Sequence, residues 1–136
     1  MSPTGQARYA MARSVALRFD DADARIREAL KQEGFGILTE IDVQATLKQK
    51  LDVDIEPYRI LGACNPPIAK QALEAEPDVG LLLPCNVVVR QSGQTVIVEA
   101  LDPVIQLEVA ENPRLNEMAG EVRERIARAI DTLPEA

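Results

Sequence analysis

The amino-acid sequence predicts a compact α+β fold, a two-layer sandwich of helices packed on a sheet. Segments with strand and helix character alternate along the chain in the order β-α-β-α-β-α-β-β-α. The turn Ser92-Gly93 joins the last two strands as a hairpin, which argues against a purely parallel sheet. A flavodoxin-like parallel sheet is the alternative, but no glycine-rich phosphate loop follows the first expected strand. At 136 residues, the chain is expected to form one domain, residues 1–136.

The expected strands are short segments rich in β-branched and other apolar residues. They cover residues 14–19, 35–41, 58–64, 79–90 and 95–100. The fourth of them is almost continuously apolar, a pattern typical of a strand that is covered on both faces. Pro84 interrupts this segment, which predicts a bulge, a kink or an edge position there. Residues 1–12 precede the first strand and are expected to be a frayed terminus.

The expected helices begin next to residues that can cap free backbone N–H groups. Asp20-Asp21 are the cap candidates for a first helix that Gly34 ends, and Asp42 can cap a second helix. The residues of this second helix that are expected to face inward are Val43, Leu47 and Leu51. Asn65-Pro66 and Asn112-Pro113 each place a cap before a proline at the first helical position. The last helix carries a long apolar stripe and is expected to close the domain over the sheet.

The charge of the chain excludes several classes of partner. Fifteen basic and 22 acidic side chains give a formal net charge of -7. The chain therefore has no basic surplus with which to bind phosphates or an anionic membrane. Two Phe, two Tyr and no Trp offer little surface on which bases could stack. We expect neither a nucleic-acid partner nor a membrane partner.

The sequence contains no histidine, which excludes Ser-His-Asp and Cys-His catalysis and every metal site that needs imidazole. Two cysteines fall short of the four ligands of a structural zinc site, so we expect no metal and no cofactor; the alternative is a zinc site in which two subunits supply four thiolates across a symmetry axis. No window approaches the ~18–20 apolar residues of a membrane span, and the N-terminus has no apolar signal-peptide core. The expected location is the cytoplasm, where both thiols are expected to be reduced.

Both cysteines occur in Cys-Asn motifs, and each motif follows an apolar segment. The motifs are Gly62-Ala63-Cys64-Asn65-Pro66-Pro67 and Leu83-Pro84-Cys85-Asn86-Val87. If the strands that carry them are parallel, equal spacings from Tyr58 to Cys64 and from Val79 to Cys85 bring both thiols to a similar height. On neighbouring strands the backbones would be about 5 Å apart, which allows a disulfide, a dithiol or a shared ligand. With one strand between them the backbones would be about 10 Å apart, which is too far for a disulfide, a dithiol or a shared ligand.

These motifs resemble those of a family known as domain of unknown function 302 (DUF302). The resemblance rests on Phe35-Gly36-Ile37 with Glu40, on the run from Tyr58 to Pro67 and on the run from Leu81 to Val87. It covers roughly residues 15–103. It implies a small α+β domain, similar to the TATA-box-binding-protein-like fold group and often forming dimers. It implies no established activity and supplies no catalytic residues.

The predicted site is a shallow pocket faced by Cys64 and Cys85, with Asn65 and Asn86 as its polar groups. Glu40 lies in an expected strand and is a further ligand-binding candidate, although a solvated strand face is the alternative for it. Cys64 precedes a helix N-terminus, where the dipole can lower the pKa of a thiol, so the two cysteines are also candidate catalytic residues. The alternative is that both are structural, because free cysteine is often buried as a small hydrophobe.

Three functions are compatible with this site. The first is a cytoplasmic binding or accessory domain that forms a homodimer and holds a small-molecule ligand near the two motifs. This function is not enzymatic, and it is the one that we favour. The second is a thiol-dependent redox protein or enzyme with Cys64 as nucleophile and Cys85 as resolving thiol, although no Cys-x-x-Cys motif is present. The third is a purely structural dimerisation module.

Overall fold

A five-stranded antiparallel sheet forms the centre of the protein, seen in a computed structural model that describes residues 6–136. The strands are β1 (Ala10–Val15), β2 (Gly36–Asp42), β3 (Tyr58–Cys64), β4 (Cys85–Ser92) and β5 (Thr95–Leu101). Their order across the sheet is β1-β5-β4-β3-β2, and every neighbouring pair is antiparallel. The α+β class is therefore confirmed, and the flavodoxin-like parallel alternative is wrong.

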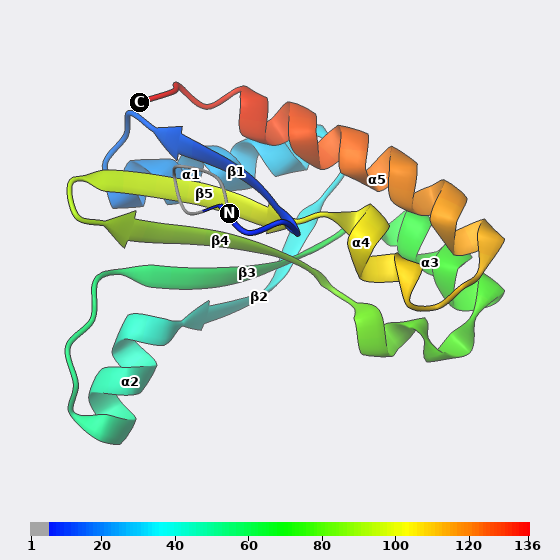
Figure 1. Cartoon of the computed structure of the whole chain (residues 1–136), viewed down its shortest axis with the longest axis horizontal. Coiled ribbons are helices and arrows are strands. Elements are labelled where there is room, and N and C mark those ends of the chain that lie inside the picture. The colour runs from blue at the N-terminus through cyan, green and yellow to red at the C-terminus, as the bar shows by residue number, and fades with distance from the viewer. Residues whose placement is uncertain (1–5) are drawn as a thin grey trace.

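The helices cover one face of this sheet and one end of it. They are α1 (Phe19–Gln32), α2 (Val43–Leu51), α3 (Pro66–Ala75), the 3-10 helix η1 (Pro77–Leu82), α4 (Pro103–Glu108) and α5 (Pro113–Asp131). Figure 1 shows α1 and α5 behind and above the strands, α3 and α4 beyond their right-hand end, and α2 projecting at the lower left. No helix of residues 6–136 covers the face of the sheet turned to the viewer, and we call it the open face.

The main core lies between the sheet and helices α1 and α5. Strands β4 and β5 turn every second residue toward these helices, as expected for a sheet covered on one face. These inward residues are Val87, Val89, Val96, Val98 and Ala100. Helices α1 and α5 pack against them with Ile26, Leu30 and Ile126. Full burial of one such side chain contributes about 1.5–3 kcal/mol, so this aliphatic cluster is what holds the last helix on the sheet.

A second, smaller cluster lies under α3, α4 and α5, beyond the end of the sheet. Its fully or nearly buried members are Ala72, Val79, Leu107, Leu115 and Ala119. It is separate from the main core, and the region between the two clusters holds the cavity described below.

Local capping sets the starts of most helices. Asp42 accepts a hydrogen bond from the N–H of Ala45, and Asn65 accepts one from the N–H of Ile68, as the sequence predicts. Gly34 ends α1 with a φ of +88°, a conformation that glycine adopts without strain. The expected cap of α1 is wrong, because this helix begins after Arg18 without a side-chain cap. Asp20 and Asp21 instead lie in its first turn, where their charges suit the helix dipole.

The first strand begins earlier than expected. Residues 10–12, assigned above to a frayed terminus, belong to β1 and pair with β5. The helix then begins at Phe19, so 16–19 are not part of the strand. The rest of the expected frayed segment lies partly in residues 1–5, which are outside the described part of the chain.

The expected strand 79–90 is wrong in its first half. Residues Pro77–Leu82 form η1, and β4 begins only at Cys85. Pro84 has no N–H to donate to a strand ladder, and the Leu83–Pro84 peptide bond is cis. An apolar run therefore divides at its proline into a short helix that packs on the second cluster and a central strand.

Two helices differ from expectation. The predicted order places a single helix after the last strand, whereas the structure has α4 before α5: Asp102 accepts the N–H of Val104, and Pro103 begins α4. Helix α2 was expected to turn Val43, Leu47 and Leu51 inward, yet none of its residues is buried and Leu51 is 65% exposed. This helix projects from the sheet (Figure 1).

Candidate functional site

The two Cys-Asn motifs meet at one end of the sheet. Strand β3 ends with Cys64, and the neighbouring antiparallel strand β4 begins with Cys85. Ala63 is the direct partner of Cys85 in this ladder. The sequence left open whether these two strands are neighbours, and the structure pairs them directly, but the parallel arrangement assumed for them is wrong. Antiparallel pairing brings the end of one strand to the start of the next.

Cys64, Asn65 and Cys85 line one cavity of about 330 Å³ at this end of the sheet. Its other walls are side chains of β2, β3, α3, α4, α5 and the segment before β4. They are predominantly aliphatic, for example Ala63, Ile68 and Leu107. The volume is at the lower end of the range for small-molecule pockets, about 300–1,000 Å³. The cavity joins the two hydrophobic clusters, since members of both line it.

Asn65 is fixed in the wall of the cavity by its role as a cap. Its side chain accepts the N–H of Ile68 at 3.3 Å, and the residue is only 7% exposed. A Cβ on Gly34 would lie 2.9 Å from Asn65 Nδ2, so the turn after α1 closes against this amide. Asn65 is thus both a helix cap and a wall residue.

The thiol of Cys85 is uncharged at neutral pH. Burial, and to a smaller extent the nearby Cys64, raise its pKa to about 11. Both cysteines are free. A buried thiol of this kind is a small apolar group with a weak S–H donor, and its raised pKa disfavours a role as thiolate nucleophile.

Gln106 is a wall residue that the sequence did not indicate. It lies on α4, and its Nε2 donates to the carbonyl oxygens of Leu82 and Pro84, the latter at 3.3 Å. Its Oε1 is the one buried side-chain N or O atom without a hydrogen-bond partner in residues 6–136. The cap-then-proline pair Asp102-Pro103 could have predicted α4, but no sequence spacing connects Gln106 with the strand that it faces.

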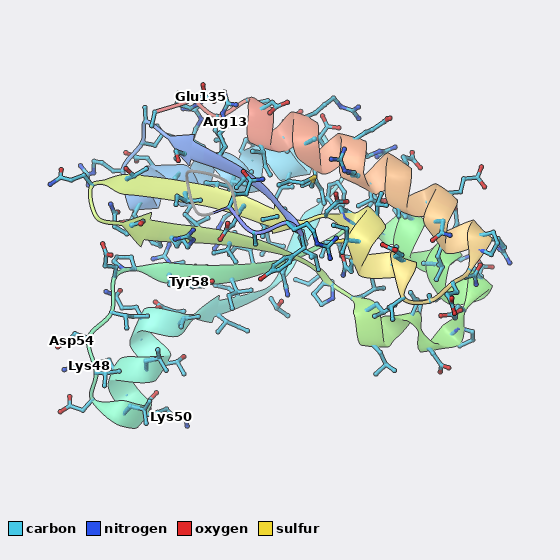
Figure 2. All side chains as sticks on the ribbon, viewed as in Figure 1. Arg13, Lys48, Lys50, Asp54, Tyr58 and Glu135 are labelled. Carbon is cyan, nitrogen blue, oxygen red and sulfur yellow. The ribbon has the colours of Figure 1, made fainter. Side chains whose placement is uncertain are left out.

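Asn86 and Glu40 are not part of this cavity. Successive residues of a strand point to opposite faces, so Asn86 lies on the open face while Cys85 packs with the core. There it borders a hollow of about 490 Å³ together with Tyr58 and others, and Figure 2 shows Tyr58 on that side of β3. The carboxylate of Glu40 is bound by Arg27 of α1.

The part of the chain that the structure describes contains neither a cluster of metal-binding side chains nor a helix suited to span a membrane. No three His, Cys, Asp or Glu side chains of residues 6–136 gather where they could hold a metal ion. None of the helices described is long and apolar enough to cross a membrane.

The fold and the site define a small α+β domain whose antiparallel sheet ends in an apolar cavity lined by two thiols. The chain belongs to the family described as domain of unknown function DUF302, whose sequence pattern matches residues 11–133. This match is longer than the stretch of resemblance noted above, and includes most of β1 and the last helix.

A solved structure supports this assignment. The chain is similar to an uncharacterised conserved DUF302 protein from Bacillus stearothermophilus, known from a crystal structure, with 32% sequence identity and a TM-score of 0.87. The similarity covers 93% of this chain and 99% of that one. No curated protein shows significant similarity to the chain.

Proposed function

We propose that this domain binds a small, neutral, apolar molecule in the cavity at the end of the sheet. One observation carries the proposal: Cys64, Asn65 and Cys85, from two separate motifs, line the same cavity of about 330 Å³. Apolar cavities of about 150 Å³ already take up benzene, so a bicyclic molecule is within the capacity of this one. The role is binding rather than catalysis.

The charge of the walls supports a neutral ligand. The lining contains no Asp, Glu, Lys or Arg side chain. The raised pKa of Cys85 keeps that thiol protonated at neutral pH. Transfer of an ion from water into an apolar cavity costs free energy unless the cavity contains a group of opposite charge. A charged ligand would find no such partner here.

Two exposed leucines form part of the rim of the cavity, where a ligand could enter. Leu38 of β2 is 67% exposed and Leu73 of α3 is 46% exposed, yet both line the cavity. An exposed apolar rim that continues into an apolar interior is a feature of ligand-binding grooves.

Binding can be tested with indene, a neutral bicyclic hydrocarbon, by ligand-observed NMR on the whole chain. Ala69 of α3 lines the cavity, so Ala69→Leu should fill it and weaken indene binding at least tenfold. The matched control is Ala45→Leu, the same change in helix α2 at an exposed alanine. Equal binding by the two variants, or no binding to the wild type, would contradict the proposal.

The thiol-dependent redox function is the second candidate, and it is less well supported. It needs a reactive thiolate, whereas burial holds the pKa of Cys85 near 11. Rapid modification of both cysteines by iodoacetamide near neutral pH, followed by mass spectrometry, would favour this function over ligand binding.

We further propose that the domain forms a homodimer through its open face. The face carries half-buried apolar side chains with no helix over them, including Ile60, Val88 and Ile97. Its central charges, Arg90 and Glu99, bind each other at 2.9 Å. Two copies of a chain with net charge -7 could therefore meet here without strong repulsion. We place this dimer in the cytoplasm, as the sequence predicts.

Sedimentation equilibrium tests the dimer. Val88→Glu places a charge on the open face and should yield monomers, whereas Val104→Glu, at an exposed valine of α4, should leave the dimer intact. A monomeric wild type would rule out the dimer. A stable dimer that binds no small molecule would instead support a purely structural module.

A further inference from the structure

The cavity is lined by both cysteines of the chain. Cys64 and Cys85 line it together, and the sequence contains no other cysteine. Both are free and only partly buried, so a molecule in the cavity can reach their thiols. The pKa of Cys85 is raised first by burial and then by the charge of Cys64, which shows that the two thiols are near each other. The apolar wall therefore presents a pair of thiols to one ligand.

Strand pairing sets the separation of the two cysteines. Ala63 is the direct partner of Cys85 in the β3–β4 ladder, and Cys64 is the next residue along β3. Neighbouring strands lie about 5 Å apart and one residue adds about 3.3 Å along a strand, so the two Cα atoms are about 6 Å apart. Cysteines whose Cα atoms lie ~4.4–6.8 Å apart can join their sulfurs directly. A single atom inserted between the two sulfurs is therefore within reach of both.

The chemistry of the walls limits what that atom can be. No Asp or Glu lines the cavity, so a metal cation would find no carboxylate beside the two thiols. Structural zinc takes four ligands, and the cavity offers two sulfurs. Trivalent arsenic that carries one organic group has the required valence, because it forms two further bonds to sulfur and stays uncharged. It also suits walls that favour a neutral ligand.

We infer that the cavity captures neutral organic molecules that carry trivalent arsenic, with the arsenic bonded to the sulfurs of both Cys64 and Cys85. The inference rests on the proposed function and adds to it a covalent site and the reactive group of the ligand. A phenyl ring fits as the organic part, because cavities of about 150 Å³ hold benzene and this one has about 330 Å³.

The capture reaction needs no oxidant and no reductant. Phenylarsine oxide is hydrated in water to an arsenic that carries one phenyl group and two hydroxyls. Each thiol forms an As–S bond while one As–O bond breaks, and the thiol proton leaves with the hydroxide as water. Two waters are released in total, and arsenic remains trivalent. The raised pKa of Cys85 keeps this thiol protonated at neutral pH, so it brings the proton that the leaving hydroxide needs.

Mass spectrometry of the intact native chain with phenylarsine oxide tests the inference. We expect one phenylarsenic group per chain with no hydroxyl left on arsenic, and both cysteines protected from iodoacetamide when the adduct is then unfolded. A product that keeps one hydroxyl, or leaves one cysteine open to iodoacetamide, has a single As–S bond and overturns the inference. This measurement uses the wild-type chain alone, so it does not depend on the folding of any variant.

Two pairs of variants locate the two bonds and the phenyl group. Cys64→Ala and Cys85→Ala each leave one thiol, and each should weaken phenylarsine oxide binding at least about a hundredfold, because the second bond is lost. Ala69→Leu fills the cavity and should weaken binding at least about tenfold, whereas Ala45→Leu in exposed α2 should not. Equal affinities of the two leucine variants would place the phenyl group outside the cavity and overturn the inference.

The outcomes also separate this inference from the proposed function. Binding of indene without bridging of the two thiols by arsenic would support an apolar ligand site and overturn only the inference. If neither indene nor phenylarsine oxide binds, the proposed function fails as well.

Discussion

Gly62 of β3 and Thr39 of β2 are sheet partners at a separation that leaves no room for a side chain on the glycine. A Cβ on Gly62 would lie 2.1 Å from Thr39 Oγ1 and 2.8 Å from Pro84 Cγ. Thr39 and Pro84 both line the cavity. The glycine that begins the first Cys-Asn motif therefore lets two wall residues close over β3.

This contact predicts that Gly62→Ala destabilises the domain by about 1–3 kcal/mol, since the new methyl group must displace its neighbours. The control is Gly36→Ala in β2, where nothing lies within 4 Å of the new Cβ. Urea unfolding monitored by circular dichroism measures both variants. Equal effects would mean that the contact with Thr39 is relieved at little cost.

The raised pKa of Cys85 predicts a loss of stability in alkali. The folded-state pKa is about 11, above the value of about 8.5 of an unfolded cysteine, so the folded state holds this proton more tightly. The resulting stabilisation is complete below about pH 8.5 and declines until about pH 11. Its slope is at most about 1.4 kcal/mol per pH unit.

Unfolding free energies at several pH values from 7.5 to 11 measure this decline. Cys85→Ala should have a flatter profile than the wild type across that window, whereas Cys64→Ala should retain most of the slope. Identical profiles for the wild type and Cys85→Ala would show that other groups cause the alkaline loss.

Asp23 joins α1 to the sheet and should be sensitive to substitution. Its carboxylate binds Arg27 at 2.6 Å and Arg59 of β3 at 3.3 Å, and it is almost buried. Asp23→Asn keeps the shape but removes the charge, and should cost about 1.5–3 kcal/mol. Asp20, 77% exposed and 3.5 Å from Arg59, is the control, for which Asp20→Asn should cost under about 1 kcal/mol. Chemical denaturation should separate the two variants.

Local chemistry explains why much of the fold could be predicted. Asn65-Pro66 and Asn112-Pro113 begin helices because a cap and a proline act within a few residues, and the structure has both helices there. The common pocket of the two cysteines was a hypothesis argued from parallel strands, and the sequence left open whether these strands are neighbours. Their pairing depends on the order of strands in the sheet, which no local pattern in the sequence records.

The remaining site residues depend on contacts between distant segments. Gln106 faces Leu82 and Pro84 only because α4 packs against the segment before β4, and no periodicity in the sequence records that contact. Asn86 is different, because the period of two within β4 could have placed it opposite Cys85. The apolar run before Pro84 resembled a strand because apolar residues are common to buried helices and strands alike.

Asn65 offers a test that separates stability from ligand binding. Asn65→Ala removes the cap of α3, the helix over the cavity, and should cost about 1 kcal/mol of stability. Asn112→Ala removes the equivalent cap of α5, where Asn112 accepts the N–H of Arg114 at 3.0 Å, and should cost a similar amount. Only Asn65 lines the cavity, so only its variant should also weaken indene binding. Equal indene affinities of the two variants, measured by ligand-observed NMR, would show that the first turn of α3 does not shape the site.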